Sequence, residues 1–222
     1  MTLQNPAGKK WITAAGLLAV IAGASLWIYF HHFAAPQFNV TLHKAVGRVM
    51  AEETARLLNR HGKLVLIAIE TPAGSELQIQ LKEFEKALKA FSGMAIAKNY
   101  TLETDKKPKY GVGSGLSARR FIRIVNKNTT ADAIVSFVGA PDLSDDEMRQ
   151  LEAKPKFIAE ARSAEKLKKL FDKQVLHAAV VSRFQFPSPV EGKPSSPRQW
   201  FDKRFQIITT ENAASLPGAG AE

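Results

Sequence analysis

The chain has 222 residues, of which 45% are hydrophobic and 23% are charged, and its formal net charge is +10. This length suits one domain with an appendage, and the ordinary balance of apolar and charged residues excludes wholesale disorder. Cysteine is absent, which excludes disulfides, thiolate metal sites and cysteine nucleophiles together. The positive charge favours acidic partners, but no nucleic-acid-binding motif accompanies it, so we expect contact with lipid and none with nucleic acid.

The first predicted element is a membrane-spanning helix over residues 11–33. From Trp11 to Phe30 the sequence runs for twenty residues without a charge. As a helix, such a segment is about 30 Å long, which is the thickness of the hydrocarbon core of a bilayer. A cleaved signal peptide with its cleavage site at residues 22–24 is the alternative. We favour the anchor because the apolar run continues beyond that site.

The charges around this helix predict its orientation. Lys9 and Lys10 precede it, and no lysine or arginine follows until Lys44. By the positive-inside rule, residues 1–10 stay in the cytoplasm and the following domain lies outside it. In a bacterium, this makes the chain a single-pass inner-membrane protein with a periplasmic domain.

One stripe of the predicted anchor consists of small residues. Ala15, Ala19 and Gly23 follow one another at intervals of four positions. Small side chains allow two membrane helices to approach closely. We therefore expect the anchor to bind other membrane protein subunits as well as the lipid bilayer.

Residues 37–210 carry the alternating pattern of an α/β domain. Continuous apolar runs, typical of strands that are covered on both faces, alternate with amphipathic helices. The predicted strands cover residues 63–70, 94–102, 131–138, 156–161, 175–181 and 205–210, and the predicted helices cover 41–61, 75–88, 117–126, 144–153 and 164–173, with a helical turn at 198–204. This alternation implies right-handed crossovers and a three-layer, Rossmann-like domain with a mainly parallel sheet. We expect Gly62 to end the first helix of the domain and residues 211–222 to form a flexible tail.

Two segments of the domain resemble a known family. They are ADAIVSFVGAPDLS, residues 131–144, and LKKLFDKQVLHAAVVSR, residues 167–183. This pattern is similar to one lobe of the type I periplasmic solute-binding fold, and the resemblance covers about residues 62–183. It implies a strand that ends at a ligand-facing loop. That family closes two lobes on a ligand, whereas this chain has the length for one lobe, so a receptor role does not follow from the fold alone.

The best candidate for an anion site is a glycine-rich basic loop that leads into a helix. Its residues are Gly111, Gly113, Ser114, Gly115, Arg119 and Arg120. Backbone amides at a helix N-terminus, together with positive charge, attract phosphate or carboxylate. The spacing matches neither the dinucleotide fingerprint nor a P-loop. A solvated surface loop is the simpler interpretation.

Polar residues also follow the predicted strands. Glu70 and Thr71 come after the first strand, and Asp142 comes after the third. In an open parallel sheet, ligands bind beyond the carboxyl ends of the strands, so these residues could hold a small polar molecule. Helix capping is the alternative role for Asp142 and its neighbours. The sequence contains no motif for a cofactor, a metal or a catalytic group, and the scattered histidines have no metal-ligand spacing.

Three classes of function fit these features. A non-catalytic accessory subunit of a larger membrane complex ranks first, because an anchor with a small-residue row and a single lobe suits that role. A membrane-tethered binding protein for a small anionic or polar solute ranks second. An enzyme that acts through the glycine-rich loop at residues 106–123 ranks third.

Overall fold

The computed structural model describes residues 6–29, 38–72, 74–102, 115–161, 167–183 and 194–216. The chain divides into two compact units, residues 1–38 and residues 39–222.

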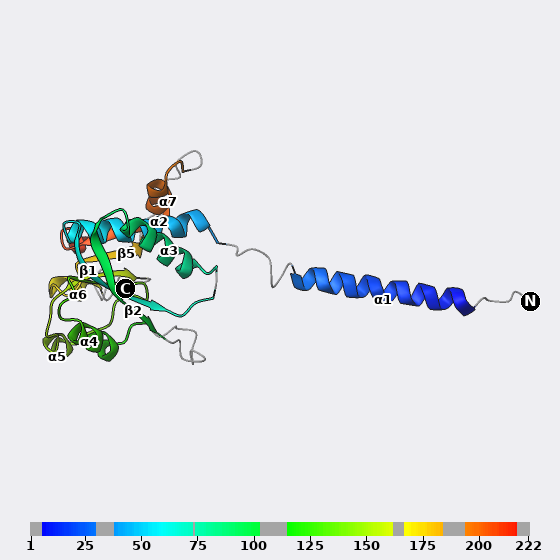
Figure 1. Ribbon diagram of the computed structural model, residues 1–222, viewed down its shortest axis with the longest axis horizontal. Helices are drawn as coiled ribbons and strands as arrows, with labels where there is room; N and C mark the ends of the chain where they lie inside the picture. Colours follow the sequence, from blue (N-terminus) through cyan, green and yellow to red (C-terminus); the bar gives the residue numbers. More distant parts are fainter. Residues whose placement is uncertain are drawn as a thin grey trace, which may run out of the picture. The chain divides into compact units, whose positions relative to one another are not determined.

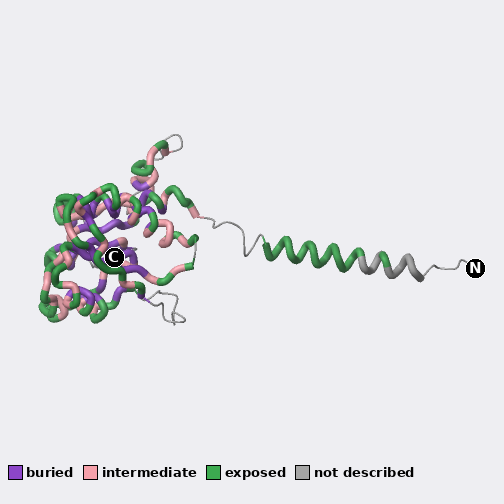
Figure 2. The backbone as a smooth tube through the Cα atoms, in the orientation of Figure 1, coloured by how far each residue is buried: buried purple, intermediate pink, exposed green. Residues whose placement is uncertain are grey.

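The N-terminal unit contains one long helix. Helix α1 covers Pro6–Ile28, so it begins before the segment 11–33 predicted as an anchor and overlaps most of it. Its large apolar side chains are exposed: Trp11, Leu18 and Val20 each retain more than two thirds of their surface (Figure 2). Ala15, Ala19 and Gly23 are exposed as well. Among the described residues, no helix is both long enough and apolar enough to cross a membrane.

The second unit is a six-stranded sheet with helices on both faces (Figure 1). Its strands are β1 His61–Ile69, β2 Gly93–Leu102, β3 Ala133–Ser136, β4 Lys156–Ala161, β5 Ala178–Ser182 and β6 Phe205–Thr209. Its helices are α2 Val40–Leu57, α3 Glu76–Leu88, α4 Ala118–Lys127, α5 Asp145–Arg149, α6 Leu167–Asp172 and α7 Pro197–Arg204, followed by a 3₁₀ turn, η2, at Ala213–Ser215. The predicted α/β class and mainly parallel sheet are confirmed, since β6 alone among the paired strands is antiparallel to its neighbour.

Each face of the sheet has its own apolar core. Alternate strand residues point to opposite faces, so Ile134 and Phe157 pack on one side while Val135 and Ile158 pack on the other. Helices α4 and α6 cover the first face, and α2, α3 and α7 cover the second. Figure 2 shows the buried segments concentrated between these layers. Burial on both faces explains why the strands are continuous apolar runs in the sequence.

The strand order, β2-β1-β3-β4-β5-β6, contains one reversal of direction. The chain moves from β1 to β2 through α3, then returns past β1 to β3 through α4 and continues to β4 and β5 through α5 and α6. Because parallel crossovers are right-handed, a reversal puts α3 on one face and α4 to α6 on the other. The reversal lies between β1 and β3, where loops leave toward opposite faces. Such a switch point is where open α/β sheets bind ligands.

Helix α2 lies against α3 at a very short distance, which one glycine makes possible. A Cβ atom built on Gly47 would lie 2.1 Å from the backbone oxygen of Gln80 on α3. The two helices are also joined by an ion pair of 2.6 Å between Arg48 and Glu83. Any side chain at position 47 would therefore force the helices apart.

The end of α2 corrects one prediction. The helix ends at Leu57, and the left-handed residues Asn59 and Arg60, with φ of 50° and 63°, turn the chain into β1. Gly62 was expected to end the helix but is the second residue of β1. The prediction was wrong because the turn after α2 has non-glycine residues in the left-handed conformation. The sequence therefore has no glycine at the position where the helix ends.

Two further elements differ in extent from their predictions. The capping box of Ser144 and Glu147 is present, but α5 ends at Arg149 instead of continuing to about residue 153. At the C-terminal end, Ala213 and Leu216 are buried in the core around η2. The packed domain thus extends to residue 216, beyond the predicted start of the tail, and residues 217–222 lie outside the described part.

Candidate functional site

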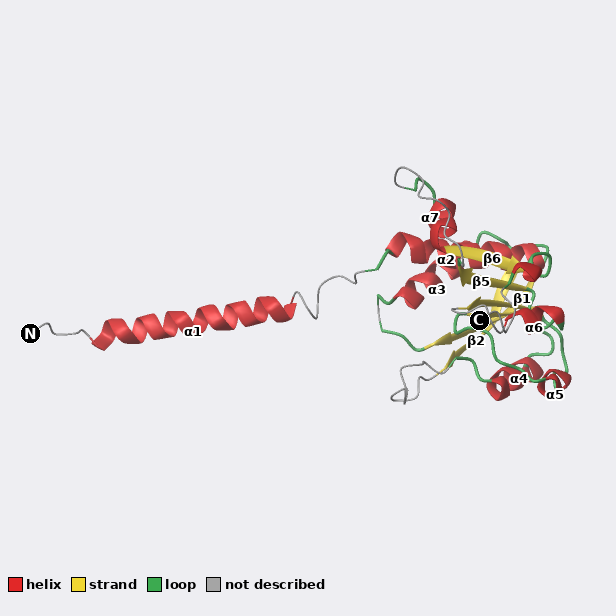
Figure 3. Cartoon of the chain, turned by 180° about the vertical axis from the view of Figure 1, so that it is seen from behind, coloured by secondary structure: helices red, strands yellow, loops and turns green. Residues whose placement is uncertain are grey.

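The candidate site is the edge of the sheet where the parallel strands end, seen from behind in Figure 3. The loop after β1 is fixed to β2 by a 3.2 Å hydrogen bond from the Glu70 amide to the Leu102 carbonyl. The residues before α4 lie close to the loop after β3, because a Cβ on Gly115 would be 3.7 Å from the Val138 oxygen. Loops from three strands therefore meet at the switch point.

A tight turn shapes the loop after β3. Ser136, the last residue of the strand, donates its hydroxyl hydrogen to the Gly139 carbonyl at 2.7 Å and accepts from the Val138 amide at 3.3 Å. Gly139 has a φ of +94°, a conformation that side chains rarely adopt. A Cβ at this position would lie 3.9 Å from the Glu160 carbonyl oxygen of β4. The turn thus keeps the backbone close to the neighbouring strand.

Below this turn, a polar network crosses from the sheet to the two helices above it. The Gln80 amide of α3 donates to the Glu160 carboxylate of β4 at 3.3 Å and lies 3.1 Å from Nδ1 of His43 on α2. The Nε2 atom of His43 is 3.6 Å from the Glu76 carboxylate. Gln80 and His43 are 3% and 9% exposed. A buried network of this kind fixes the relative positions of the elements it joins.

Burial decides the charge of His43. Desolvation lowers the pKa of the imidazole, and the Glu76 carboxylate opposes this effect only in part. The Gln80 amide can donate to Nδ1 only when that nitrogen carries no proton. The neutral ring, with its proton on Nε2 facing Glu76, fits both contacts.

The structure brings several of the predicted site residues to this edge. Glu70 and Asp142 are exposed in the loops after β1 and β3, and Thr71 is half-buried beside Glu70. Asp142 precedes the cap of α5, which is Ser144. The predicted anion-binding role of these three residues stays a prediction.

The glycine-rich loop is described only at its end. Gly111, Gly113 and Ser114 lie outside the described residues. Gly115 is exposed, and Arg119 and Arg120 are exposed in the first turn of α4. Helix α4 is the crossover from β2 to β3, so its first turn, with Arg119 and Arg120, lies on the side of the sheet where β2 ends.

Sequence reasoning missed Gln80 and Glu160 as site residues. One signal was available: Glu160 interrupts the apolar strand KFIAEA, and a glutamate within such a strand needs a buried partner. That partner lies 80 positions earlier in the sequence, on α3. No local pattern connects the two residues.

The carboxyl edge also has a cavity at its β5 end, with a volume of about 530 Å³. Its lining combines the indole of Trp200, the cationic side chains of Lys203 and Arg204, and the end of β5 at Ser182. The N-terminal residues of α2, Asn39 and Leu42, complete the lining. An aromatic surface beside hydrogen-bond donors is a common arrangement in sites for small polar ligands.

Buried His43 and half-buried His177 give the domain a pH-dependent stability. The pKa of His43 is lowered by burial, and that of His177 by burial and by Lys156. Both rings accept hydrogen bonds at Nδ1, from Gln80 and from the Phe157 amide. Because the unfolded chain binds protons at a pKa of about 6.5, we expect the free energy of unfolding to be constant above about pH 7 and to fall as the pH drops below about 6.5.

Urea denaturation between pH 5 and pH 8 measures this dependence. The double variant His43→Asn/His177→Asn retains an acceptor near each Nδ1 position and should remove most of the slope. An unchanged slope in the variant would contradict the assignment to these two rings.

Comparison with known proteins gives the fold a context. No protein-family model matches the sequence. No curated protein matches it either. Among solved structures, an arabinose-binding protein from Geobacillus stearothermophilus is 16% identical with a TM-score of 0.53, covering 79% of this chain and 63% of its own. A sugar-binding protein of a sugar ABC transporter from Bacillus halodurans is 15% identical with a TM-score of 0.55, covering 79% of this chain and 64% of its own.

A third match is an ABC transporter solute-binding protein from Burkholderia graminis, solved in complex with D-arabinose. It is 15% identical with a TM-score of 0.51 and covers 78% of this chain and 62% of its own. The domain shares the fold of a lobe of the type I periplasmic solute-binding proteins. The resemblance inferred from residues 131–144 and 167–183 is thereby confirmed at the level of fold. This chain spans less than two thirds of the length of each of these proteins.

Proposed function

We propose that the chain is a non-enzymatic binding protein for a small polar or anionic solute, which it holds at the carboxyl edge of its sheet. The observation that carries this proposal is the reversal of strand order between β1 and β3. It gathers the loop after β1, the start of α4 and the loop after β3 at one place. Carboxylates from Glu70 and Asp142 and guanidinium groups from Arg119 and Arg120 are available there.

The comparisons support this function better than that of an accessory subunit. The similar structures are named for binding sugars, and the fold is shared although the identity is low. Sugars are bound by carboxylates and amides that accept and donate hydrogen bonds in pairs. Both types of group are present at the carboxyl edge of this domain.

We further propose that the N-terminal helix tethers this binding domain to the outer side of the inner membrane. The support comes from the sequence: an uncharged stretch from Trp11 to Phe30 preceded by Lys9 and Lys10. Contacts of Ala15, Ala19 and Gly23 with other subunits stay a prediction from the small-residue row.

A ligand screen tests the binding function. The full-length chain is heated with a panel of pentoses, hexoses and small anions such as phosphate and acetate. A true ligand at one hundred times its dissociation constant stabilises the native state by about 2.7 kcal/mol, so we expect the melting temperature to rise by roughly 5–10 °C. No shift with any member of the panel would contradict the proposal for these solute classes.

Variants of the edge then locate the site. Asp142→Asn should weaken binding of a neutral sugar, whereas Arg119→Ala/Arg120→Ala should weaken binding of an anion by about tenfold or more. The control is Lys82→Gln/Lys86→Gln, which removes two exposed positive charges from α3. A ligand whose affinity changes as much in the control as in the edge variants does not bind at the proposed site.

A further inference from the structure

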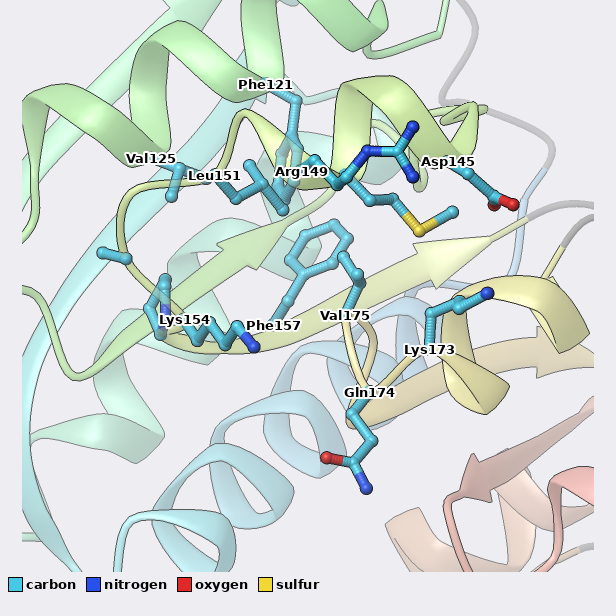
Figure 4. A pocket seen from close by; sticks show the side chains of 13 residues that line it. Phe121, Val125, Asp145, Arg149, Leu151, Lys154, Phe157, Lys173, Gln174 and Val175 are labelled. Carbon is cyan, nitrogen blue, oxygen red and sulfur yellow. The ribbon is translucent and has the colours of Figure 1, made fainter.

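The domain has a second cavity. It has a volume of about 370 Å³ and is enclosed by α4, α5, the segment that leads into β4 and the turn after α6 (Figure 4). Its lining includes Phe157, the second residue of β4, and Val175, which precedes β5. The cavity therefore extends from the start of α5, at Asp145, to the amino ends of these strands.

The cavity exists because one crossover helix is too short. Helix α5 has five residues and is about 7.5 Å long, whereas the six residues of β4 extend for about 20 Å. After Arg149 the chain runs on to β4 without a helix. This segment between α5 and β4, which includes Leu151, Ala153 and Lys154, forms part of the cavity lining.

The inner wall of the cavity is apolar. Phe121 and Phe157 have their rings 4.7 Å apart and are almost fully buried. Half-buried side chains complete the wall: Met148, Leu151, Ala153 and Val175. Such surfaces gain free energy when an apolar ligand replaces water against them.

The rim of the cavity is positively charged. It carries Arg149, Lys154 and Lys173 against one carboxylate, Asp145. That carboxylate pairs with Lys169 at 3.2 Å, and Lys169 lowers its pKa. No ion pair of Lys154 or Lys173 is found within the described parts of the chain. In Figure 4 these two lysines lie on either side of Phe157.

The turn after α6 fixes one side of the rim. Gln174 adopts a left-handed conformation with φ of 55°, and the Val175 amide donates to the Leu170 carbonyl at 2.9 Å. This ending of the helix places Lys173 on the rim and Val175 in the wall. The turn at residues 173–175 therefore contributes both a charged side chain to the rim and an apolar side chain to the wall.

We propose that this cavity binds a small anion with an apolar body, such as an aromatic carboxylate. The ring would lie against the half-buried side chains of the wall, Met148, Leu151 and Val175, and the carboxylate would lie at the positively charged rim to which Lys154 and Lys173 contribute. The volume lies at the small end of the range for ligand pockets, which favours one or two fused rings over a larger molecule. This site is separate from the solute site proposed at the carboxyl edge.

Isothermal titration calorimetry with 2-naphthoate tests the proposal on the full-length chain at pH 7.5. The neutral analogue 2-naphthamide has the same ring system without the charge. We expect naphthoate to bind more tightly than the amide, and Lys154→Gln/Lys173→Gln to weaken naphthoate binding about fivefold while it leaves amide binding unchanged. Ala153→Phe should fill the cavity and abolish binding of both compounds.

Controls distinguish this site from nonspecific binding. Lys82→Gln/Lys86→Gln removes the same charge from exposed positions on α3, which covers the other face of the sheet, and should leave both affinities unchanged. Circular dichroism verifies that each variant is folded, and the lysine pair provides the result if Ala153→Phe does not fold. Absence of naphthoate binding, or equal losses in the two lysine double variants, would overturn the proposal.

Discussion

The variant Gly47→Ala should lose about 2–4 kcal/mol of stability, although alanine is the better helix former. The new methyl group would lie 2.1 Å from the Gln80 backbone oxygen, far inside van der Waals contact. Neither helix can move a backbone atom without disturbing its own hydrogen bonds. We therefore expect α2 and α3 to separate and the contact between His43 and Gln80 to lengthen.

Thermal and urea denaturation of the full-length chain measure this loss. Gly16→Ala is the matched control, because Gly16 lies in a helix and a Cβ there meets nothing within 4 Å. The control should retain the stability of the unmodified protein to within about 0.5 kcal/mol. If Gly47→Ala were as stable as this control, the close approach of α2 and α3 would be refuted.

The variant Gln80→Leu should destabilise the domain by about 3 kcal/mol, because it removes the two hydrogen bonds that Gln80 makes in the buried polar network. The Glu160 carboxylate loses the donor at 3.3 Å, and His43 loses the amide at 3.1 Å. A half-buried carboxylate that loses a hydrogen bond bears part of its desolvation cost uncompensated. Leucine has a similar volume, so the packing between α2, α3 and the sheet is largely retained.

A double-mutant cycle with Glu160→Leu separates this effect from a change in packing. If the hydrogen bond is the cause, the double variant should lose at least about 1 kcal/mol less than the sum of the two single variants. Additive losses would show that Gln80 and Glu160 act independently. The same variants also test whether the network supports solute binding at the carboxyl edge.

The sequence predicted helix starts and strand bounds well where they depend only on a side chain and the residues next to it in the sequence. Strand β4 has the predicted bounds, and the helices predicted to start at residues 75 and 144 begin at the caps Ser75 and Ser144. A cap needs only a hydroxyl and a backbone amide three residues later, so the sequence contains all the partners. The helix ends that differ, at Leu57 and Arg149, are places where a turn or a crossover ends a helix without glycine. Strand ends differ as well, since β3 covers Ala133–Ser136 and β5 covers Ala178–Ser182 instead of the predicted 131–138 and 175–181.

The candidate site could be predicted only in part. The rule that ligands bind at the carboxyl ends of strands indicated the edge where Glu70, Thr71 and Asp142 lie, and ligand binding by these residues stays a prediction. It did not indicate the network of His43, Gln80 and Glu160, because its members come from α2, α3 and β4 and meet only after the sheet is assembled.

The sequence by itself therefore determined the α/β class, the alternation of strands and helices and the polar loops that follow the strands, because periodicity and capping are local properties. Tertiary structure decided the strand order with its switch point, the contact of Gly47 with α3, the buried polar network and the cavity beside Phe157. Each of these depends on side chains from distant segments, and their packing is set by the whole sheet rather than by any one element.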